Sequence, residues 1–328
     1  VKRNLFGLSE DDKAELQWKP EDQLAMMNEA VHTNGSFLTA LSAMIEKAQP
    51  LEGADHPIGV KPVQGLLQTV MREWSAEGSA ERGSCFERLI GAVEGHLGAQ
   101  AAAAASSGSA RPRVLLPCSS LGRLAYDIKG RGYDCVCCEP RALQYFTCEY
   151  IQQHGAKEST TIQPFALSTC NRLQREDHVR KIPFPEMDIL PGAFPEIRFG
   201  EFTRLFDAPG ELAAFDALVT AFAVDVSPNI FRFVRTAAHV VRPGGLWANF
   251  GPLAFDTDHD EGHGHGIEIS WDELRHAVSH FFDIEDEAFV NCFNAANGRS
   301  MMQIEYSCIF FSAVRNDKPS VGIGGAVV

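Results

Sequence analysis

The chain has 328 residues, of which 45% are hydrophobic, and this is enough for one large domain or for a domain with a helical addition. Its 29 Lys and Arg residues are outnumbered by 43 Asp and Glu residues, and the resulting formal charge of -14 repels the phosphates of nucleic acids. We therefore expect a globular protein with no nucleic-acid partner.

Apolar residues at helical spacing predict an N-terminal helical region. The predicted helices are residues 21–45, 65–74 and 81–97. The alanine run and the SSGSARPR motif within residues 99–113 predict a low-complexity linker or loop. We therefore expect residues 1–110 to form a helical region with a linker, and residues 111–315 to form an α/β domain.

Residues 114–139 predict a strand, a tight turn, a helix and a second strand that ends in an acid. Pro117 and small residues form the turn, and Gly130 and Gly132 end the helix. The acid is Glu139, at the edge of the sheet where open α/β folds bind ligands. The pattern predicts a ligand with a ribose, whose two hydroxyls Glu139 can accept; an ordinary βαβ unit without a ligand is the alternative.

Two cofactors with a ribose compete for this site. A nicotinamide dinucleotide needs a G-x-G-x-x-G turn for its pyrophosphate, and the corresponding stretch, CSSLG at residues 118–122, keeps only the last glycine. S-adenosyl-L-methionine carries no phosphate, so its loop needs small residues and a close backbone but no anion-binding turn. The turn therefore favours S-adenosyl-L-methionine.

The remaining segments continue the α/β pattern. A helix at 143–153 is followed by a proline-rich insertion at about 157–198, and long insertions of this kind often form a substrate lid. The later predicted elements are, in chain order, a strand with an acid at Glu201 and Phe202, a buried strand at 215–222, a helix at 229–241, a strand after the RPGG turn at 242–245, a helix at 271–280 and an antiparallel strand pair within 289–314. Residues 316–328 predict a disordered tail.

Nine cysteines raise the question of metal ligands or disulfides, and their arrangement favours neither. No two CxxC motifs are paired, and Cys135, Cys137 and Cys138 lie in a predicted buried strand, where thiols pack as small apolar groups. An odd number of cysteines also argues against a secreted disulfide framework. Because no signal-peptide pattern and no bilayer-length apolar stretch occur, we expect a cytoplasmic protein, with the nucleus as an alternative, and no membrane partner.

The order of these elements is the plan of the class I S-adenosylmethionine methyltransferases. We therefore predict an α/β fold with a Rossmann-like, mostly parallel sheet and an N-terminal helical addition. Right-handed crossovers bring the carboxyl ends of the parallel strands to one edge, where the cofactor and the substrate should meet.

Beyond this general plan, the chain resembles the carnosine N-methyltransferase (N2227-like) family over roughly residues 65–314. The motifs that carry the resemblance are MREWSAEGSAERGSCF (71–86), LLPCSSLGRLAYDI (115–128), FDALVTAFAVD (215–225), VVRPGGLWANFGPL (240–253), IEISWDEL (267–274) and RSMMQIEYSC (299–308). Members of that family transfer a methyl group from S-adenosylmethionine to an imidazole nitrogen of the dipeptide carnosine.

The resemblance implies cofactor contacts at Arg72, Cys118, Ser120, Glu139, Glu201, Phe202 and Ala221. Arg72 lies in a predicted N-terminal helix, and a guanidinium there could hold the methionyl carboxylate through two parallel hydrogen bonds; a solvated helix arginine is the alternative. The family's usual glycines are replaced by Cys118 and Ser120, which are still small.

The resemblance also implies substrate contacts at Asp225, Asp256, Ile304 and Tyr306. Asp225 and Tyr306 match the family, whereas Asp256 replaces a histidine and Ile304 replaces a tyrosine. A carboxylate that accepts a hydrogen bond from an imidazole fixes its tautomer and stabilises the developing charge. We therefore expect Asp225 and Tyr306 to be catalytic; a helix N-cap and a core aromatic are their alternative roles.

Three histidines, His259, His263 and His265, stand in an acidic, glycine-rich loop, and we expect the loop to close over the substrate rather than to hold a functional metal. The sequence therefore predicts an S-adenosylmethionine-dependent methyltransferase of a small molecule, with an imidazole nitrogen of a carnosine- or histidine-like compound as the acceptor. Another small amine or a thiol as acceptor, or a pseudoenzyme that only binds the cofactor, are the alternatives. A homodimer is one option for the oligomeric state.

Overall fold

The computed structural model describes residues 7–16, 18–48, 59–155, 159–190, 192–255 and 267–319. Within these ranges, no helix has the length and apolar character that a bilayer crossing requires. The predictions for Asp256, for the histidine-containing loop and for most of the tail fall outside the described residues.

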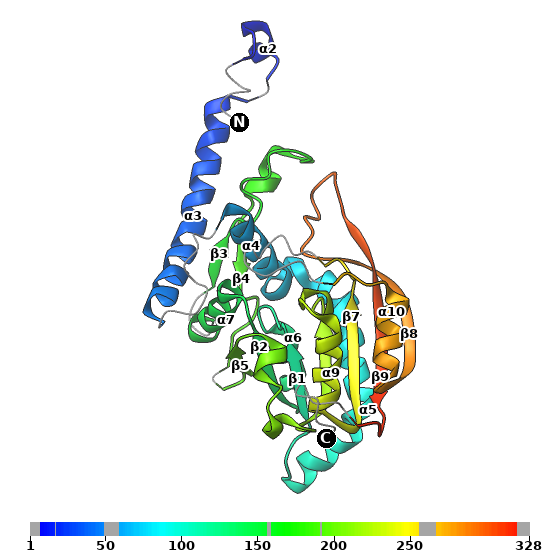
Figure 1. The fold of residues 1–328 in the computed structure, drawn as a ribbon. Helices are drawn as coiled ribbons and strands as arrows, with labels where there is room; N and C mark the ends of the chain where they lie inside the picture. Colours follow the sequence, from blue (N-terminus) through cyan, green and yellow to red (C-terminus); the bar gives the residue numbers. More distant parts are fainter. Residues whose placement is uncertain are drawn as a thin grey trace.

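Seven strands form the main sheet, and all but one of them run parallel (Figure 1). In spatial order they are β5 (Glu196–Phe199), β2 (Asp134–Glu139), β1 (Arg113–Pro117), β6 (Phe215–Ala221), β7 (Val241–Gly251), β9 (Glu305–Arg315) and β8 (Phe282–Phe293). β9 runs antiparallel to both of its neighbours, β7 and β8. β1, β2 and β6 are continuous apolar runs because both of their faces are covered. The predicted α/β fold with a mostly parallel, Rossmann-like sheet is confirmed.

Helices cover both faces of this sheet, and alternate strand residues point to the two layers. α9 (Ile230–Val240) and α10 (Trp271–Ser279) share one core with Leu115 of β1. α5 (Ser79–Ser107) and α6 (Arg123–Gly130) share the other core with Leu116, the next residue of the same strand. Cys135, Cys137 and Cys138 are buried in these two cores, as the sequence predicts, and burial raises the pKa of each thiol.

A third core joins the N-terminal helices to the sheet edge. The elements around it are α3 (Pro20–Lys47), α4 (Val60–Trp74), α7 (Ala142–His154) and the two-stranded sheet of β3 (Thr160–Ile162) and β4 (Ile182–Phe184). Phe37 of α3 packs edge-on against Tyr150 and Phe184, with ring centroids 5.1 and 5.4 Å away. α3 extends beyond this core toward the short helix α2 (Glu10–Ala14), as Figure 1 shows.

The predicted linker at residues 99–113 is wrong over most of its length, because α5 continues without a break to Ser107. Alanine has the highest helix propensity, so the alanine run extends the helix. The helix ends where Gly108 adopts a left-handed conformation with φ 69° and its N–H bonds to the carbonyl of Ala104. The domain boundary predicted near residue 110 therefore falls between α5 and β1, although the two pack in the same core.

Two further boundaries differ from the prediction. β5 lies at the end of the predicted 157–198 insertion but belongs to the main sheet, paired with β2. The strand predicted at Glu201 and Phe202 is wrong: the chain turns at Gly200, with φ 138°, and α8 (Phe202–Leu205) begins with Glu201 as its N-cap. β5 has only four residues, of which none is buried, and it lies between Pro195 and Gly200, so its sequence carries little strand signal.

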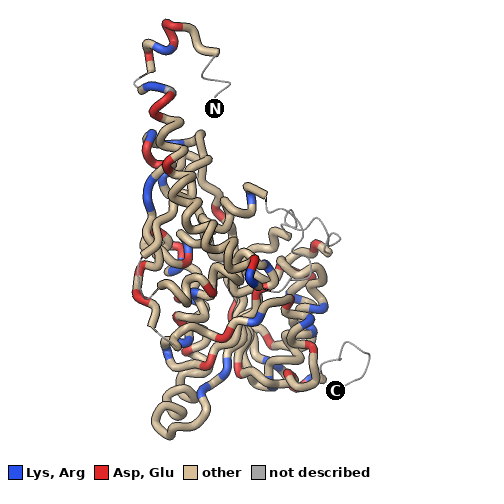
Figure 2. Tube along the Cα trace, turned by 90° about the vertical axis from the view of Figure 1, so that its left-hand side faces the viewer, with Lys and Arg blue, Asp and Glu red and all other residues tan. Residues whose placement is uncertain are grey.

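Charged side chains are distributed over the whole described trace. Figure 2 shows Lys and Arg interspersed with Asp and Glu rather than collected in one stripe. Many of them form surface ion pairs, such as Arg275 with Glu287 at 2.8 Å.

Candidate functional site

The turn after β1 has a glycine-like backbone at two positions that are not glycine. Cys118 and Ser120 have φ values of 49° and 54°, in the left-handed region, and Gly122 follows at 75°. The N–H of Ser119 donates to the carbonyl of Cys138 at 3.1 Å, and the N–H of Ser120 donates to Glu139 at 2.9 Å. The turn is therefore held against the end of β2, at the edge where the sequence predicts the cofactor.

The conformation of Ser120 leads to a stability prediction. A left-handed conformation costs a residue with a Cβ atom roughly 1 to 2 kcal/mol, and glycine avoids most of this cost. Ser120→Gly should therefore unfold with a free energy about 1 kcal/mol higher than Ser120→Ala, because both variants lose the hydroxyl and only glycine relieves the backbone. Denaturant unfolding of the two variants measures the difference. Equal stabilities would show that the turn is not strained at this residue.

A pocket opens beside this turn, between the end of α4 and the end of β6. Its described lining residues are Thr69, Arg72, Glu73, Phe86, Leu116, Pro117, Cys118, Ser119, Ser120, Leu124, Arg141, Val219, Ala221, Phe222 and Asn294. It encloses about 120 Å³, which is less than the roughly 300 Å³ at the lower end of ligand pockets. A ligand of cofactor size therefore requires some lining side chains to move.

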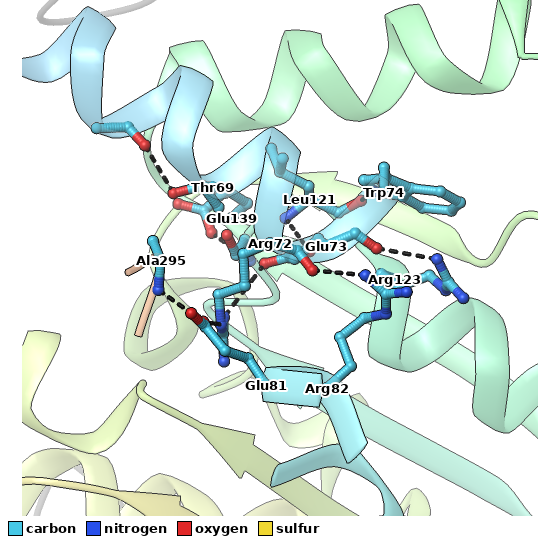
Figure 3. Close-up of polar contacts among 12 residues, drawn as sticks. Thr69, Arg72, Glu73, Trp74, Glu81, Arg82, Leu121, Arg123, Glu139 and Ala295 are labelled. Atoms are coloured by element: carbon cyan, nitrogen blue, oxygen red, sulfur yellow. Dashed lines mark hydrogen bonds and ion pairs between the residues drawn. The ribbon is translucent and has the colours of Figure 1, made fainter. Parts of the chain in front are cut away.

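The end of α4 is attached directly to the turn (Figure 3). The indole N–H of Trp74 donates to the carbonyl of Leu121 at 3.0 Å, and the N–H of Leu121 donates to Oε2 of Glu73 at 3.1 Å. Arg123 donates to the carbonyl of Glu73 at 2.9 Å. An N-terminal helix thus forms one wall of the pocket, as the sequence predicts from Arg72.

Arg72 is buried in this wall, with 5% of its surface exposed, and its guanidinium is incompletely satisfied. Its Nε and Nη2 atoms have no hydrogen-bond partner among the described residues. Two carboxylates lie at ion-pair distances, Glu81 at 3.5 Å and Glu73 at 3.8 Å, and the ring of Phe222 lies 5.0 Å below the charge. Buried N–H groups without partners are costly, so an incoming carboxylate would be stabilised here.

Glu139 is fully buried and lies just behind the pocket wall. Its two oxygens accept four hydrogen bonds: from the N–H of Ser120, from the N–H of Arg141, and from Nε and Nη2 of Arg141 at 2.7 and 3.1 Å. A carboxylate has about four lone-pair positions, so all of them are used. Ribose hydroxyls can reach Glu139 only if the side chain of Arg141 moves away.

The other predicted cofactor residues differ in their positions. Cys118, Ser120 and Ala221 line the pocket. Phe202 does not line it, because its side chain is buried in the core against Phe206 and Phe233. Glu201 is the N-cap residue of α8, and its carboxylate accepts a hydrogen bond from the hydroxyl of Thr203.

The three predicted acceptor residues that the structure describes are not among the residues that line the pocket. Asp225 is in a short 3₁₀ turn after β6, and its Oδ2 accepts the N–H of Ala254 at 2.8 Å. Tyr306 packs edge-on against the pocket residue Phe222, with centroids 6.5 Å apart. Ile304 is 61% exposed and does not contribute to the wall.

Several residues of the site were not predicted from the sequence. Glu73 directly follows Arg72, and Arg141 lies two residues after Glu139. Their nearness to these predicted cofactor residues is the signal by which the sequence could have indicated them. Phe222 lies at the end of a predicted strand, but its left-handed φ of 51° could not be foreseen. Glu81 accepts the N–H groups of Ala295 and Ala296 at 2.8 and 2.9 Å, and thereby joins Arg72 to the loop before β9.

The family model described as carnosine N-methyltransferase matches residues 52–317. The chain belongs to this family. The resemblance seen in its motifs is thus confirmed. Curated carnosine N-methyltransferases are 28% identical over 270 residues in Dictyostelium discoideum, 25% over 256 residues in Mus musculus and 28% over 279 residues in Drosophila melanogaster. These alignments cover 79%, 76% and 82% of this chain, but only 55%, 62% and 58% of the relatives.

Solved structures are more distant. The N-methyltransferase NodS from Bradyrhizobium japonicum, in complex with S-adenosyl-L-homocysteine, is 11% identical, with a TM-score of 0.40 over 76% of this chain and 98% of its own. The PH0226 protein from Pyrococcus horikoshii is 9% identical, with a TM-score of 0.43 over 79% and 100%. The strand order of the sheet, rather than these superpositions, defines the fold.

Proposed function

We propose that this chain is an S-adenosylmethionine-dependent methyltransferase of a small molecule, with an imidazole nitrogen of a carnosine- or histidine-like compound as the acceptor. The observation that carries the proposal is the buried guanidinium of Arg72, a lining residue of the pocket beside the turn after β1, two of whose nitrogen atoms make no hydrogen bond among the described residues. Family membership supplies the reaction class. The matched relatives are named for methylation of carnosine, and they are longer than this chain.

The residues present fit the cofactor. Arg72 would bind the methionyl carboxylate, the turn at residues 118–120 would lie against the cofactor backbone, and Glu139 would accept the ribose hydroxyls once Arg141 has moved. The cofactor supplies a methyl group on a sulfonium, ready for in-line displacement. The chain's own task is to align the acceptor and exclude water.

The acceptor side rests on Asp225 and Tyr306. A neutral imidazole nitrogen is already nucleophilic near neutral pH, so no strong base is required. The carboxylate of Asp225 would accept a hydrogen bond from the other ring nitrogen and stabilise the imidazolium as it forms. Tyr306, which packs on Phe222 beside the pocket, would orient the ring with its hydroxyl.

Methylation assays with a panel of acceptors test the proposal. Purified chain with labelled S-adenosylmethionine should methylate imidazole compounds such as histamine and histidine faster than small thiols. Carnosine should be slower than the best imidazole by roughly tenfold to a hundredfold, because Asp256 and Ile304 replace polar partners and leave its carboxylate unpaired.

Each outcome of the panel has a distinct meaning. Carnosine as clearly the best acceptor would overturn the argument from Asp256 and Ile304. A thiol or another amine as the best acceptor would favour the alternative substrate class. Cofactor binding without turnover on any acceptor would indicate a pseudoenzyme.

A further inference from the structure

Glu73 is the one acidic residue among the described residues that line the pocket. Only 2% of its surface is exposed. Its neighbour Arg72 lies in the same wall, and the two opposite charges approach to 3.8 Å, between Nη1 and Oε1, without a hydrogen bond (Figure 3). The end of α4 therefore presents a cation and an anion side by side to the same small space.

The carboxylate of Glu73 is not fully compensated by its surroundings. The N–H of Leu121 donates to Oε2 at 3.1 Å, and the hydroxyl of Ser120 and the N–H of Arg123 also act as donors to the carboxylate, so about one of its roughly four acceptor positions is left free. Burial raises the pKa of Glu73, and the charge of Arg72 together with the donors from Ser120, Arg123 and Leu121 opposes this effect only in part. A buried carboxylate in this state gains more from an additional cationic donor than an exposed one.

No other carboxylate of the described site can take this role. The turn from Pro117 to Gly122 contains no acidic residue. Glu139 already accepts four hydrogen bonds and lies behind Arg141. Glu81 pairs with Arg72 and with the N–H groups of Ala295 and Ala296, outside the pocket wall.

We infer that Arg72 and Glu73 together form a binding site for a zwitterionic amino-acid group, with Arg72 on its carboxylate and Glu73 on its ammonium. An α-amino acid carries these two charges on one carbon atom, which matches two opposite protein charges that are close together but not bonded to each other. The inference rests on the proposed function, because the methionyl part of S-adenosylmethionine is such a group. Glu73 thereby determines which adenosyl compounds the site accepts.

Calorimetry with three ligands tests the inference. The ligands are S-adenosylhomocysteine, its deaminated analogue and its decarboxylated analogue. The wild-type chain should bind S-adenosylhomocysteine roughly tenfold to a hundredfold more tightly than the deaminated analogue, as expected for one hydrogen bond between charged groups. In Glu73→Gln this ratio should fall toward one, while the preference over the decarboxylated analogue remains.

Glu81→Gln is the matched control, because it also removes a carboxylate beside Arg72 but not one that lines the pocket. It should keep the preference for the ammonium. A glutamine at position 73 retains an oxygen for the N–H of Leu121, so the turn keeps its contact with α4.

Two results would overturn the inference. One is an unchanged ammonium preference in Glu73→Gln. The other is a wild-type chain that binds S-adenosylhomocysteine and its deaminated analogue equally well, and this result decides the matter even if the variant does not fold. Failure of the wild-type chain to bind S-adenosylhomocysteine at all would instead overturn the proposed function, and the inference with it.

Discussion

Glu139→Ala is expected to bind S-adenosylhomocysteine about a hundredfold more weakly than the parent chain. Two hydrogen bonds from ribose hydroxyls to a carboxylate are worth roughly 1.5 to 3 kcal/mol each. The full sum is not realised, because the hydroxyls replace two bonds that Arg141 makes to Glu139 in the structure. A net loss of about 2 to 3 kcal/mol corresponds to the expected change, and calorimetry measures it directly.

Arg141 provides the comparison for this result. Arg141→Ala removes the side chain that covers Glu139, so the ribose no longer has to displace it. This variant should bind the ligand at least as tightly as the parent, in contrast to Glu139→Ala. Parent-like affinity in Glu139→Ala would show that the ribose lies elsewhere.

Asp225→Asn is expected to lower turnover of an imidazole acceptor by roughly a hundredfold, while affinity for the cofactor stays within about twofold of the parent. The carboxylate is needed when positive charge develops on the ring, whereas Asp225 is not part of the described pocket wall. Asparagine keeps the size and an acceptor oxygen for the N–H of Ala254, which now bonds to Asp225 at 2.8 Å.

The substitution therefore separates a catalytic from a structural role. Asp225→Ala is the companion variant, because it removes the bond to Ala254 as well as the charge. If Asp225 only holds the backbone at Ala254, Asp225→Asn should turn over normally and Asp225→Ala alone should lose activity and stability. Single-turnover rates and thermal unfolding of both variants distinguish these cases.

Strongly patterned elements of the fold could be predicted from the sequence, and weakly patterned ones could not. β1, β2 and β6 are apolar runs bounded by turn residues, and α9 has one apolar face, so their positions agree with the prediction. β5 is short and only half-buried, and it becomes a strand because β2 offers it an edge. The end of α5 has the low complexity of a linker, but it is helical because alanine has the highest helix propensity.

The site shows the same division between local and spatial information. The turn, Glu139 and Arg72 could be predicted because each lies within a motif that is recognisable along the chain. Glu73 reaches the site because α4 packs against the turn, which the sequence does not show. Arg141 covers the carboxylate of Glu139 because of its side-chain rotamer, which the sequence does not show either. Phe202 is buried because it packs against Phe233 of α9. This contact joins segments that are distant in the sequence, so the sequence alone does not show whether Phe202 faces the core or the cofactor.

A crystal structure of the chain with bound S-adenosylhomocysteine is the most direct test of the proposed cofactor site. We expect the methionyl carboxylate on Nε and Nη2 of Arg72, the ribose hydroxyls on Glu139, and the side chain of Arg141 displaced from its present position. A ligand bound outside the pocket between α4 and β6, or a ribose that leaves Arg141 on Glu139, would contradict it.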